Sequence, residues 1–435
     1  MVEVTPLRGW RYDVGQVGSL ADVTAPPYDV INAAEQKELY EKHPCNCIRL
    51  ILNRDEPGDE SSDARYERAS RFLSQWKQDG ILQQEKENAF YVYNQEFDWE
   101  GTHYVRTGFL GRIKIEEFGK GEVYPHEQTM SGPKADRLAL LKAGETNLSP
   151  IFGLYPDTNN NVQAPLDEAV RGITPLEVTD ELGVLHRIWA VTDHAIISKV
   201  QEALREKPIF IADGHHRYET ANNYRNWLQS EGKLGDNSDP ANYVLMHFVG
   251  MSDPGLAILP THRLVSGLEN ISAEELQITL GDHFELEEIG TGDAAAKETW
   301  ELMDADGGQD VFGFGTPSDG KWFFARLTDA SPMKELAAEQ SEEWQQLGVS
   351  LLHRMVIDHL IKNKHAQGEI SWKYVHLMDE VNNAMANKSC QLACLVAPAG
   401  IEHVETIASE FEKMPPKSTF FYPKLLSGLV FNPLT

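Results

Sequence analysis

The most informative segment of the chain reads Lys207-Pro208-Ile209-Phe210-Ile211-Ala212-Asp213-Gly214-His215-His216-Arg217-Tyr218-Glu219-Thr220-Ala221. Its first half is an apolar strand pattern that runs into Asp213-Gly214, and a helical pattern begins directly after the glycine. A strand that turns sharply into a helix is a recurring unit of folds that combine both kinds of element. The segment therefore predicts an α/β chain of the mixed α+β type.

The first turn of the expected helix carries three potentially cationic side chains, His215, His216 and Arg217. Cations at this end oppose the helix dipole and cost about 0.3–1 kcal/mol each. A bound anion would reverse that sign, and free backbone N–H groups, Gly214 and the planar guanidinium of Arg217 together suit a phosphate. Asp213 is placed either to cap the helix or to hold a metal ion. An N-capped helix with merely exposed histidines is the alternative, but the strand-to-helix context favours a phosphate site.

The net charge of the chain limits the kinds of molecule that it can bind. The chain has 435 residues, with 67 acidic against 39 basic side chains and a formal net charge of −28. Coulomb repulsion disfavours general binding to nucleic acid or to an anionic membrane. An anionic substrate would therefore need a local basic pocket. The length indicates two or three packed units.

Targeting and redox signals are sparse. No run approaches the roughly 20 apolar residues of a membrane-spanning helix, and the first residues do not resemble a signal peptide. For the four cysteines, buried thiols in strands are favoured over a zinc site, because Cys45 and Cys47 are too close for the usual ligand spacing. Without a disulfide framework, we expect a cytoplasmic protein.

The patterns divide the chain into three expected regions: 1–150, 151–265 with the phosphate-binding turn, and a smaller α+β region at 266–435. We predict helices at 61–76, 136–142, 195–204, 215–228, 273–280 and 349–361. We predict strands at 48–52, 185–191, 208–211, 243–248, 284–289, 311–315 and 322–327, and near Tyr374 and Cys394. A hairpin is expected from 90–97 and 104–115, with a turn at 98–101.

The segment Asp213–Ala221 resembles the phosphate-binding box of the ParB/sulfiredoxin superfamily. Its members include the sulfiredoxins, the CTP-binding ParB clamps and the free-serine kinases. In this superfamily a Gly-x-x-Arg turn binds the phosphates of a nucleotide. The resemblance implies a ParB/sulfiredoxin-like nucleotide-binding unit with additional α+β subdomains. It also implies that Gly214, His215, His216 and Arg217 hold phosphate oxygens. The box here lacks a cysteine, which argues against sulfiredoxin chemistry.

A longer resemblance covers essentially the entire chain. Segments 22–31, 125–137, 149–155 and 414–424 are similar to the bacterial domain-of-unknown-function 1015 family. That family has been linked with serine metabolism and is regarded as distantly similar to the free-serine kinases. Serine as a substrate is what this resemblance implies.

A second polar segment, His126–Arg137, leads into an expected helix. Lys134 and Arg137 could neutralise the charge of a transferring phosphate, and Glu127 or His126 could deprotonate a hydroxyl. The alternative is a helix start with solvated charges, and we place function ahead of it.

For three further candidate sites, a functional role and a purely structural role are equally consistent with the sequence. Asp29, after Pro26-Pro27-Tyr28, suits either a metal ligand or a base, or else only a turn. Arg263 could reach a phosphate or pair with a surface acid. Lys417 and Lys424 belong to a basic, hydroxylated patch that resembles phosphate binders but lacks the glycines of a P-loop. A solvated turn is the alternative, and whether this patch joins the site stays open.

These observations lead to a phosphotransferase hypothesis. We expect reversible phosphoryl transfer between ATP or ADP with Mg²⁺ and the hydroxyl of free serine. The catalytic candidates are Glu127, His126, Lys134, Arg217 and Asp29, and the nucleotide candidates are Asp213 to Arg217, Arg137, Arg263 and Lys417, with Asp213 as the metal ligand. A nucleotide-independent phosphoserine phosphatase and a non-enzymatic nucleotide switch are the alternatives. The expected partners are small phosphorylated molecules and a nucleotide, and a homodimer is left open.

Overall fold

The computed structural model describes residues 1–127 and 131–435 of the chain. These described residues divide into two compact units. Unit 1 comprises 1–125, 131–257 and 423–435, and unit 2 comprises 126–127 and 258–422. Helices and strands occur in both units, which confirms the mixed α+β class. Residues on both sides of the expected boundary at 150 contribute to unit 1.

The described residues of unit 1 form a nine-stranded sheet, in the order β6-β11-β8-β12-β5-β4-β10-β9, with β1 beside β5. Its strands are β1 (Val4–Thr5), β4 (Phe90–Trp99), β5 (Thr102–Lys114), β6 (Val123–Pro125), β8 (Ile151–Tyr155), β9 (Leu176–Thr179), β10 (Leu185–Val191), β11 (Ile209–Asp213) and β12 (Tyr243–Gly250). The expected hairpin is confirmed as β4 and β5. Glu100 and Gly101 connect them with φ of 47° and 78°, as a two-residue hairpin turn requires.

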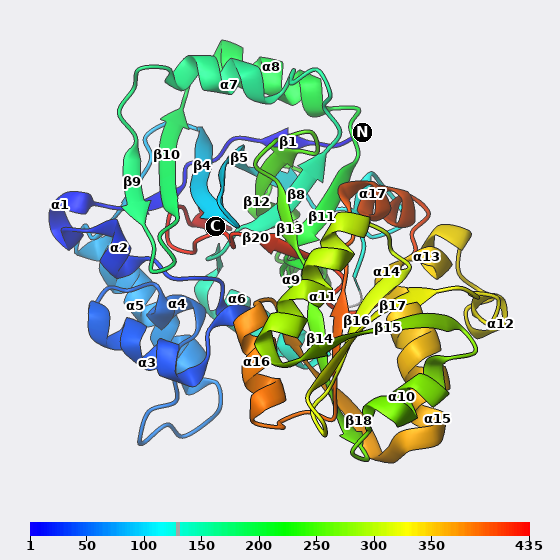
Figure 1. Cartoon of the computed structure of the whole chain (residues 1–435). Helices are drawn as coiled ribbons and strands as arrows, with labels where there is room; N and C mark the ends of the chain where they lie inside the picture. Colours follow the sequence, from blue (N-terminus) through cyan, green and yellow to red (C-terminus); the bar gives the residue numbers. More distant parts are fainter. Residues whose placement is uncertain (128–130) are drawn as a thin grey trace. The chain divides into compact units, whose positions relative to one another are not determined.

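Helices cover this sheet in two groups. Figure 1 shows α7 (Gln163–Val170) and α8 (His194–Leu204) side by side, and their buried faces join the core formed with the strands. The other group is α5 (Ala64–Gln78), α6 (Ser131–Gly144) and α9 (His215–Ser230). In this group α6 contacts both α5 and α9. The predicted helices at 61–76, 136–142, 195–204 and 215–228 are therefore confirmed.

The strand predicted at 48–52 is wrong, because this run forms the short helix α4 (Ile48–Ile51). The Asn46 side chain accepts a hydrogen bond from the Ile48 N–H at 2.9 Å and starts the turn. Ile48, Leu50 and Ile51 are buried, and Arg49 is the one polar residue of the run. Four apolar residues in a run of five leave no period that separates a helix from a strand. Cys45 and Cys47 accordingly precede a helix, and Cys47 is buried as its N-cap.

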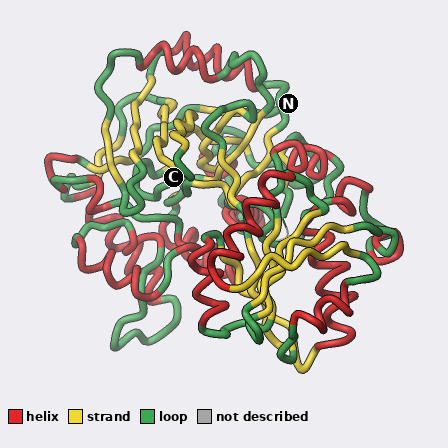
Figure 2. The backbone as a smooth tube through the Cα atoms, in the orientation of Figure 1, coloured by secondary structure: helices red, strands yellow, loops and turns green. Residues whose placement is uncertain are grey.

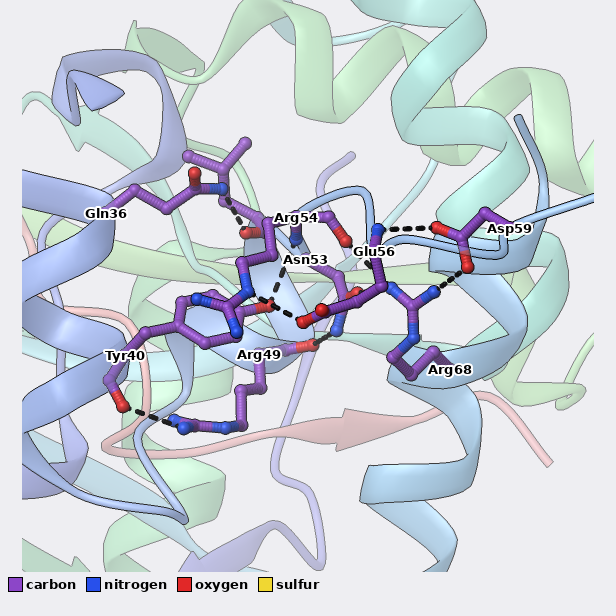
Figure 3. A network of polar contacts seen from close by, with 9 residues as sticks. Gln36, Tyr40, Arg49, Asn53, Arg54, Glu56, Asp59 and Arg68 are labelled. Atoms are coloured by element: carbon purple, nitrogen blue, oxygen red, sulfur yellow. Dashed lines mark hydrogen bonds and ion pairs between the residues drawn. The ribbon is translucent and has the colours of Figure 1, made fainter. Parts of the chain in front are cut away.

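Unit 1 also contains several smaller elements. They are α1 (Val14–Val17), α2 (Leu20–Val23), η1 (Tyr28–Val30), α3 (Ala33–Lys42), η2 (Pro240–Asn242) and the paired strands β2 (Trp10–Tyr12) and β3 (Leu82–Gln84). Figure 3 shows the polar network that fixes the loop after α4. Asn53 donates to the Arg49 carbonyl at 2.8 Å and accepts from Arg68 of α5 at 2.8 Å, and Arg68 also pairs with Asp59. The network holds the end of α4 in place between α3 and α5.

In the part of unit 2 that the structure describes, six strands form a sheet in the order β15-β17-β16-β19-β14-β18. They are β14 (His262–Leu268), β15 (Phe284–Thr291), β16 (Val311–Thr316), β17 (Lys321–Leu327), β18 (Ala366–Val375) and β19 (Leu392–Val396), and β13 (Ala257–Leu259) and β20 (Phe420–Tyr422) lie outside it. These strands confirm those predicted after residue 280.

Helices lie on both sides of the unit 2 sheet (Figure 2). One core cluster joins the strands to α11 (Gly292–Asp306) and α16 (Met378–Ala386). A second cluster joins them to α10 (Ala273–Leu280), α12 (Met333–Leu336), α13 (Glu342–Gln346), α14 (Gly348–Ser350), the π-helix η3 (Leu351–Ile361) and α17 (Ile401–Ser409), and α15 (Lys362–His365) continues η3. The helices predicted at 273–280 and 349–361 are confirmed. Among the described helices, none combines the length and apolar character needed to cross a membrane.

Candidate functional site

The predicted phosphate-binding turn lies in unit 1, where β11 ends at Asp213 and α9 begins at His215. Gly214 is the N-cap of α9 and has φ of 93°, in the left-handed region that disfavours a side chain. A Cβ atom at this position would also lie 3.0 Å from Cζ of Arg217. The turn therefore requires glycine for its backbone conformation and for the close approach of the guanidinium.

Asp213 is the centre of an ion-pair group. Its Oδ2 accepts from Nη2 of Arg217 at 2.6 Å, and its Oδ1 lies 3.2 Å from Nζ of Lys424. Arg217 also donates to the carbonyl of Pro150, just before β8. The N-cap is Gly214, so the observed role of Asp213 is to hold two cations and not to cap the helix.

A pocket opens beside this turn within unit 1. Its polar lining is Arg137, Thr146, Asn147, Ser149, Arg217 and Thr220, and its remaining lining is Tyr28, Ile51, Leu140, Leu141, Leu148 and Val244. Two guanidinium groups on one partly apolar pocket suit a small anionic molecule with a carbon skeleton.

Arg137 is held in the pocket wall from several sides. Its Nε donates to Asp136 at 2.7 Å, Nη1 donates to the carbonyl of Ile51, and its guanidinium lies 4.0 Å from the centre of the Tyr28 ring. Burial would raise the pKa of Asp136, but Arg137 and the hydroxyl of Tyr66 outweigh it, and the pKa is lowered. Burial raises the pKa of Tyr28. Arg137 thus faces the pocket already oriented.

Thr220 supplies a further polar group. It lies on α9 near the end of the box, and its side chain is buried, with 3% of the residue exposed. Within the residues that the structure describes, its Oγ1 has no hydrogen-bond partner. A buried hydroxyl without a partner costs roughly 1–3 kcal/mol, so a polar ligand in the pocket would relieve this cost.

The other unit 1 candidates lie around the turn. His215 is buried and His216 is half-buried at the start of α9. Nζ of Lys134 pairs with Glu219 of α9 at 2.7 Å, which connects α6 to α9. Asp29 is exposed in η1. Their predicted roles in phosphate binding and catalysis stay predictions.

Four predicted site residues lie in unit 2 instead. His126 is buried, and its Nε2 is 2.9 Å from Oγ1 of Thr419. The backbone of Glu127 forms an isolated parallel β-bridge with that of Met414. Arg263 is also buried, and its Nη2 donates to the carbonyl of Lys417 at 2.9 Å. Burial lowers the pKa of Arg263 to about 10, although Glu127 acts in the opposite direction. The structure therefore brings these four residues together in a second group, and their roles stay predictions.

Metal binding at Asp213 also stays a prediction. Among the described residues, no group of three His, Cys, Asp or Glu side chains could hold a metal ion. The cysteines are free thiols, and Cys47, Cys390 and Cys394 are buried. Burial raises the pKa of Cys390 to about 11.

The pocket includes residues that sequence reasoning missed. Tyr28 is next to the candidate Asp29 in a proline-rich turn, and Thr220 lies inside the box Asp213–Ala221. The neighbouring sequence therefore indicated both positions. Ser149 lies in the segment 149–155 quoted for the family resemblance, whereas Thr146 and Asn147 had no signal of their own. Thr146 and Asn147 form β7 (Thr146–Asn147), which pairs with the distant β21 (Asn432–Pro433).

Comparison with known proteins identifies the family. The family model described as "Protein of unknown function (DUF1015)" matches residues 4–350. The chain belongs to this family, as the resemblance of its segments implied. A search of curated proteins found no match.

Several solved structures are similar at low identity. A free serine kinase in complex with AMP is 13% identical, with 69% of this chain and 83% of that chain covered and a TM-score of 0.32. A conserved hypothetical protein from Pyrococcus furiosus is 14% identical, with 69% and 87% covered and a TM-score of 0.32. SbnI with C-terminal truncation from Staphylococcus aureus is 11% identical, with 75% and 87% covered and a TM-score of 0.33.

Proposed function

We propose that this protein is a phosphotransferase that moves a phosphoryl group between a nucleotide and the hydroxyl of a small metabolite. The supporting observation is the pocket beside Gly214, where Arg137, Arg217 and the buried hydroxyl of Thr220 line one cavity. Phosphoryl transfer depends mainly on positioning and on cationic groups that stabilise the phosphate charge. A local group of cations is what a chain of net charge −28 needs in order to bind an anion.

Each group has a distinct part in the proposed site. The backbone N–H groups at the start of α9 and the guanidinium of Arg217 would bind phosphate oxygens. Arg137 would neutralise charge from the other wall, and Thr220 would donate its hydroxyl hydrogen. The apolar lining, such as Leu141 and Val244, would exclude water from the carbon part of the ligand.

The fit to Mg²⁺ differs from the fit to phosphate. Both oxygens of Asp213 already contact cations, Arg217 and Lys424, in this structure. Asp213 therefore does not by itself present a metal site, although Mg²⁺ commonly takes many of its ligands from phosphates and water. We assign no step to the metal, and His126, Glu127 and Asp29 stay candidates for the base.

Serine is the proposed acceptor. This choice follows from the resemblance of Asp213–Ala221 to the box of the free-serine kinases. The reaction is reversible, so phosphoserine and ADP would give serine and ATP. A cytoplasmic location is proposed with it, since the substrates are metabolites.

The test is an incubation of purified protein with Mg²⁺ and phosphoserine, with and without ADP, in which serine, ATP and free phosphate are followed. ATP that forms only with ADP present would support the kinase. Free phosphate without nucleotide would replace it with the phosphatase, and no turnover would favour the nucleotide switch. Arg217→Gln should abolish the activity. Arg187→Gln is the matched control, because Arg187 pairs with Glu96 and Glu177 away from the pocket and should keep the activity.

A further inference from the structure

The segment Pro423–Thr435 belongs to unit 1, although residues 258–422 of unit 2 separate it from the rest of that unit in the sequence. Buried side chains of the hairpin hold its start. Nη2 of Arg106 donates to the carbonyl of Pro423 at 2.5 Å, and Nε2 of Gln95 donates to the carbonyl of Lys424 at 3.0 Å. Arg106 and Gln95 are both fully buried, so the backbone around Lys424 is fixed by the core of the sheet.

The same segment supports the pocket wall. Oγ of Ser427 is 2.7 Å from Oγ of Ser149, and Nδ2 of Asn432 donates to Oδ1 of Asn147 at 2.8 Å. Ser149 and Asn147 both line the pocket. The segment therefore forms part of the structure around the anion site, and its residues lie beyond the range 4–350 that the family model matches.

Lys424 brings a charge to this site. Its Nζ lies 3.2 Å from Oδ1 of Asp213, and its side chain is only 17% exposed. Asp213 and Arg217 alone would cancel each other's charge, whereas the three side chains together carry one net positive charge. Low exposure weakens solvent screening, so this difference acts strongly on a phosphate at the turn.

We infer that Lys424 is a positioning residue of the anion site, which balances the charge of Asp213 so that Arg217 remains available to a phosphate. The ligand class is a phosphate ester or nucleotide, and the inference rests on the proposed function. Lys424 acts through Asp213, because one carboxylate oxygen contacts Lys424 while the other orients Arg217.

The test compares binding of ADP and of phosphoserine by isothermal titration calorimetry. Lys424→Gln should weaken the binding of at least one of them about tenfold, and Lys424→Arg should stay within about threefold of the natural protein. The matched control is Lys207→Gln. Lys207 pairs with Asp157 at 3.3 Å and is 24% exposed, but it lies just before β11, at the end of the strand away from Asp213.

A double variant distinguishes two roles of Lys424: balancing the charge of Asp213, and only holding the C-terminal segment in place. Asp213→Asn added to Lys424→Gln restores the net charge and should recover part of the affinity, whereas a lysine that only anchors the segment would give no recovery. Equal binding by Lys424→Gln and the natural protein would overturn the role of Lys424 alone. If the natural protein binds neither probe, the proposed function fails, and this inference fails with it.

Discussion

Arg217 and Asp213 are four residues apart on either side of Gly214, and Nη2 of the arginine lies 2.6 Å from Oδ2 of the aspartate. The arginine side chain is 10% exposed and the aspartate side chain 23% exposed. Arg217 also reaches the carbonyl of Pro150, so the guanidinium connects the end of β11 to the start of β8. An arginine fixed in this way is oriented before any ligand binds.

Replacement of Arg217 by lysine should weaken phosphate binding although the charge is kept. An ammonium group cannot span Asp213 and Pro150 and offer a planar pair of donors as well. Loss of a charged hydrogen bond corresponds to about 1.5–3 kcal/mol, or roughly tenfold to a hundredfold in affinity. Titration of ADP into Arg217→Lys would measure this, and an unchanged affinity would exclude Arg217 as a phosphate ligand.

Gly214→Ala should disturb both the turn and Arg217. The positive φ costs a non-glycine residue roughly 1–2 kcal/mol, and the new methyl group would lie against the guanidinium. We expect a lower free energy of unfolding and weaker binding of ADP. Gly18→Ala is a suitable control, because Gly18 also has a positive φ, of 77°, but a Cβ there would meet no atom within 4 Å. That variant should lose stability and keep its affinity.

Thr220→Val should separate binding from stability. The Thr220 hydroxyl has no partner among the described residues, so its removal should leave the free energy of unfolding unchanged or raise it. Binding of ADP or phosphoserine should weaken, because the ligand loses a donor. Thr24→Val is the matched control, since Thr24 is buried and donates to the Leu20 carbonyl at 2.8 Å. It should lose about 1 kcal/mol of stability with unchanged binding.

The buried His247 should make the protein sensitive to acid. Burial, with a smaller contribution from Arg106, lowers the pKa of His247 to about 3 in the folded state. The unfolded chain takes up the proton below about pH 6.5, so stability falls from there towards pH 3 by about 1.4 kcal/mol per pH unit. Urea unfolding at several pH values should show a shallower decline for His247→Gln, with a constant difference from the natural protein above pH 7.5. An equal slope below pH 6 would contradict this assignment.

Local patterns predicted much of the fold. The strand, turn and helix around Gly214 and the hairpin of β4 and β5 carry their signals within a few neighbouring residues, and both form as expected. The strand predicted at 48–52 was wrong because four of its five residues are apolar and the helix that forms has only one turn. Such a run contains no period by which a helix could be recognised.

The assembly of the site was much harder to predict. Lys424 and Asp213 are 211 residues apart, and Asn432 and Asn147 are 285 apart. The sequence around these four residues contains no spacing pattern from which either contact could be predicted. The same applies to Arg106, whose burial depends on a carbonyl of a distant segment. Residue types at the turn could therefore be predicted, but the residues that support them could not.

The division of unit 1 along the chain has a consequence for protein synthesis. A ribosome makes the residues up to 257, then those of 258–422, and only afterwards the segment Pro423–Thr435. At about 5–20 residues per second, the delay is on the order of ten to thirty seconds. During that interval the nascent chain has Asp213 and Arg217 but no Lys424, and β7 has no β21 to pair with. The pocket can thus be completed only after the polypeptide of the other unit has been translated.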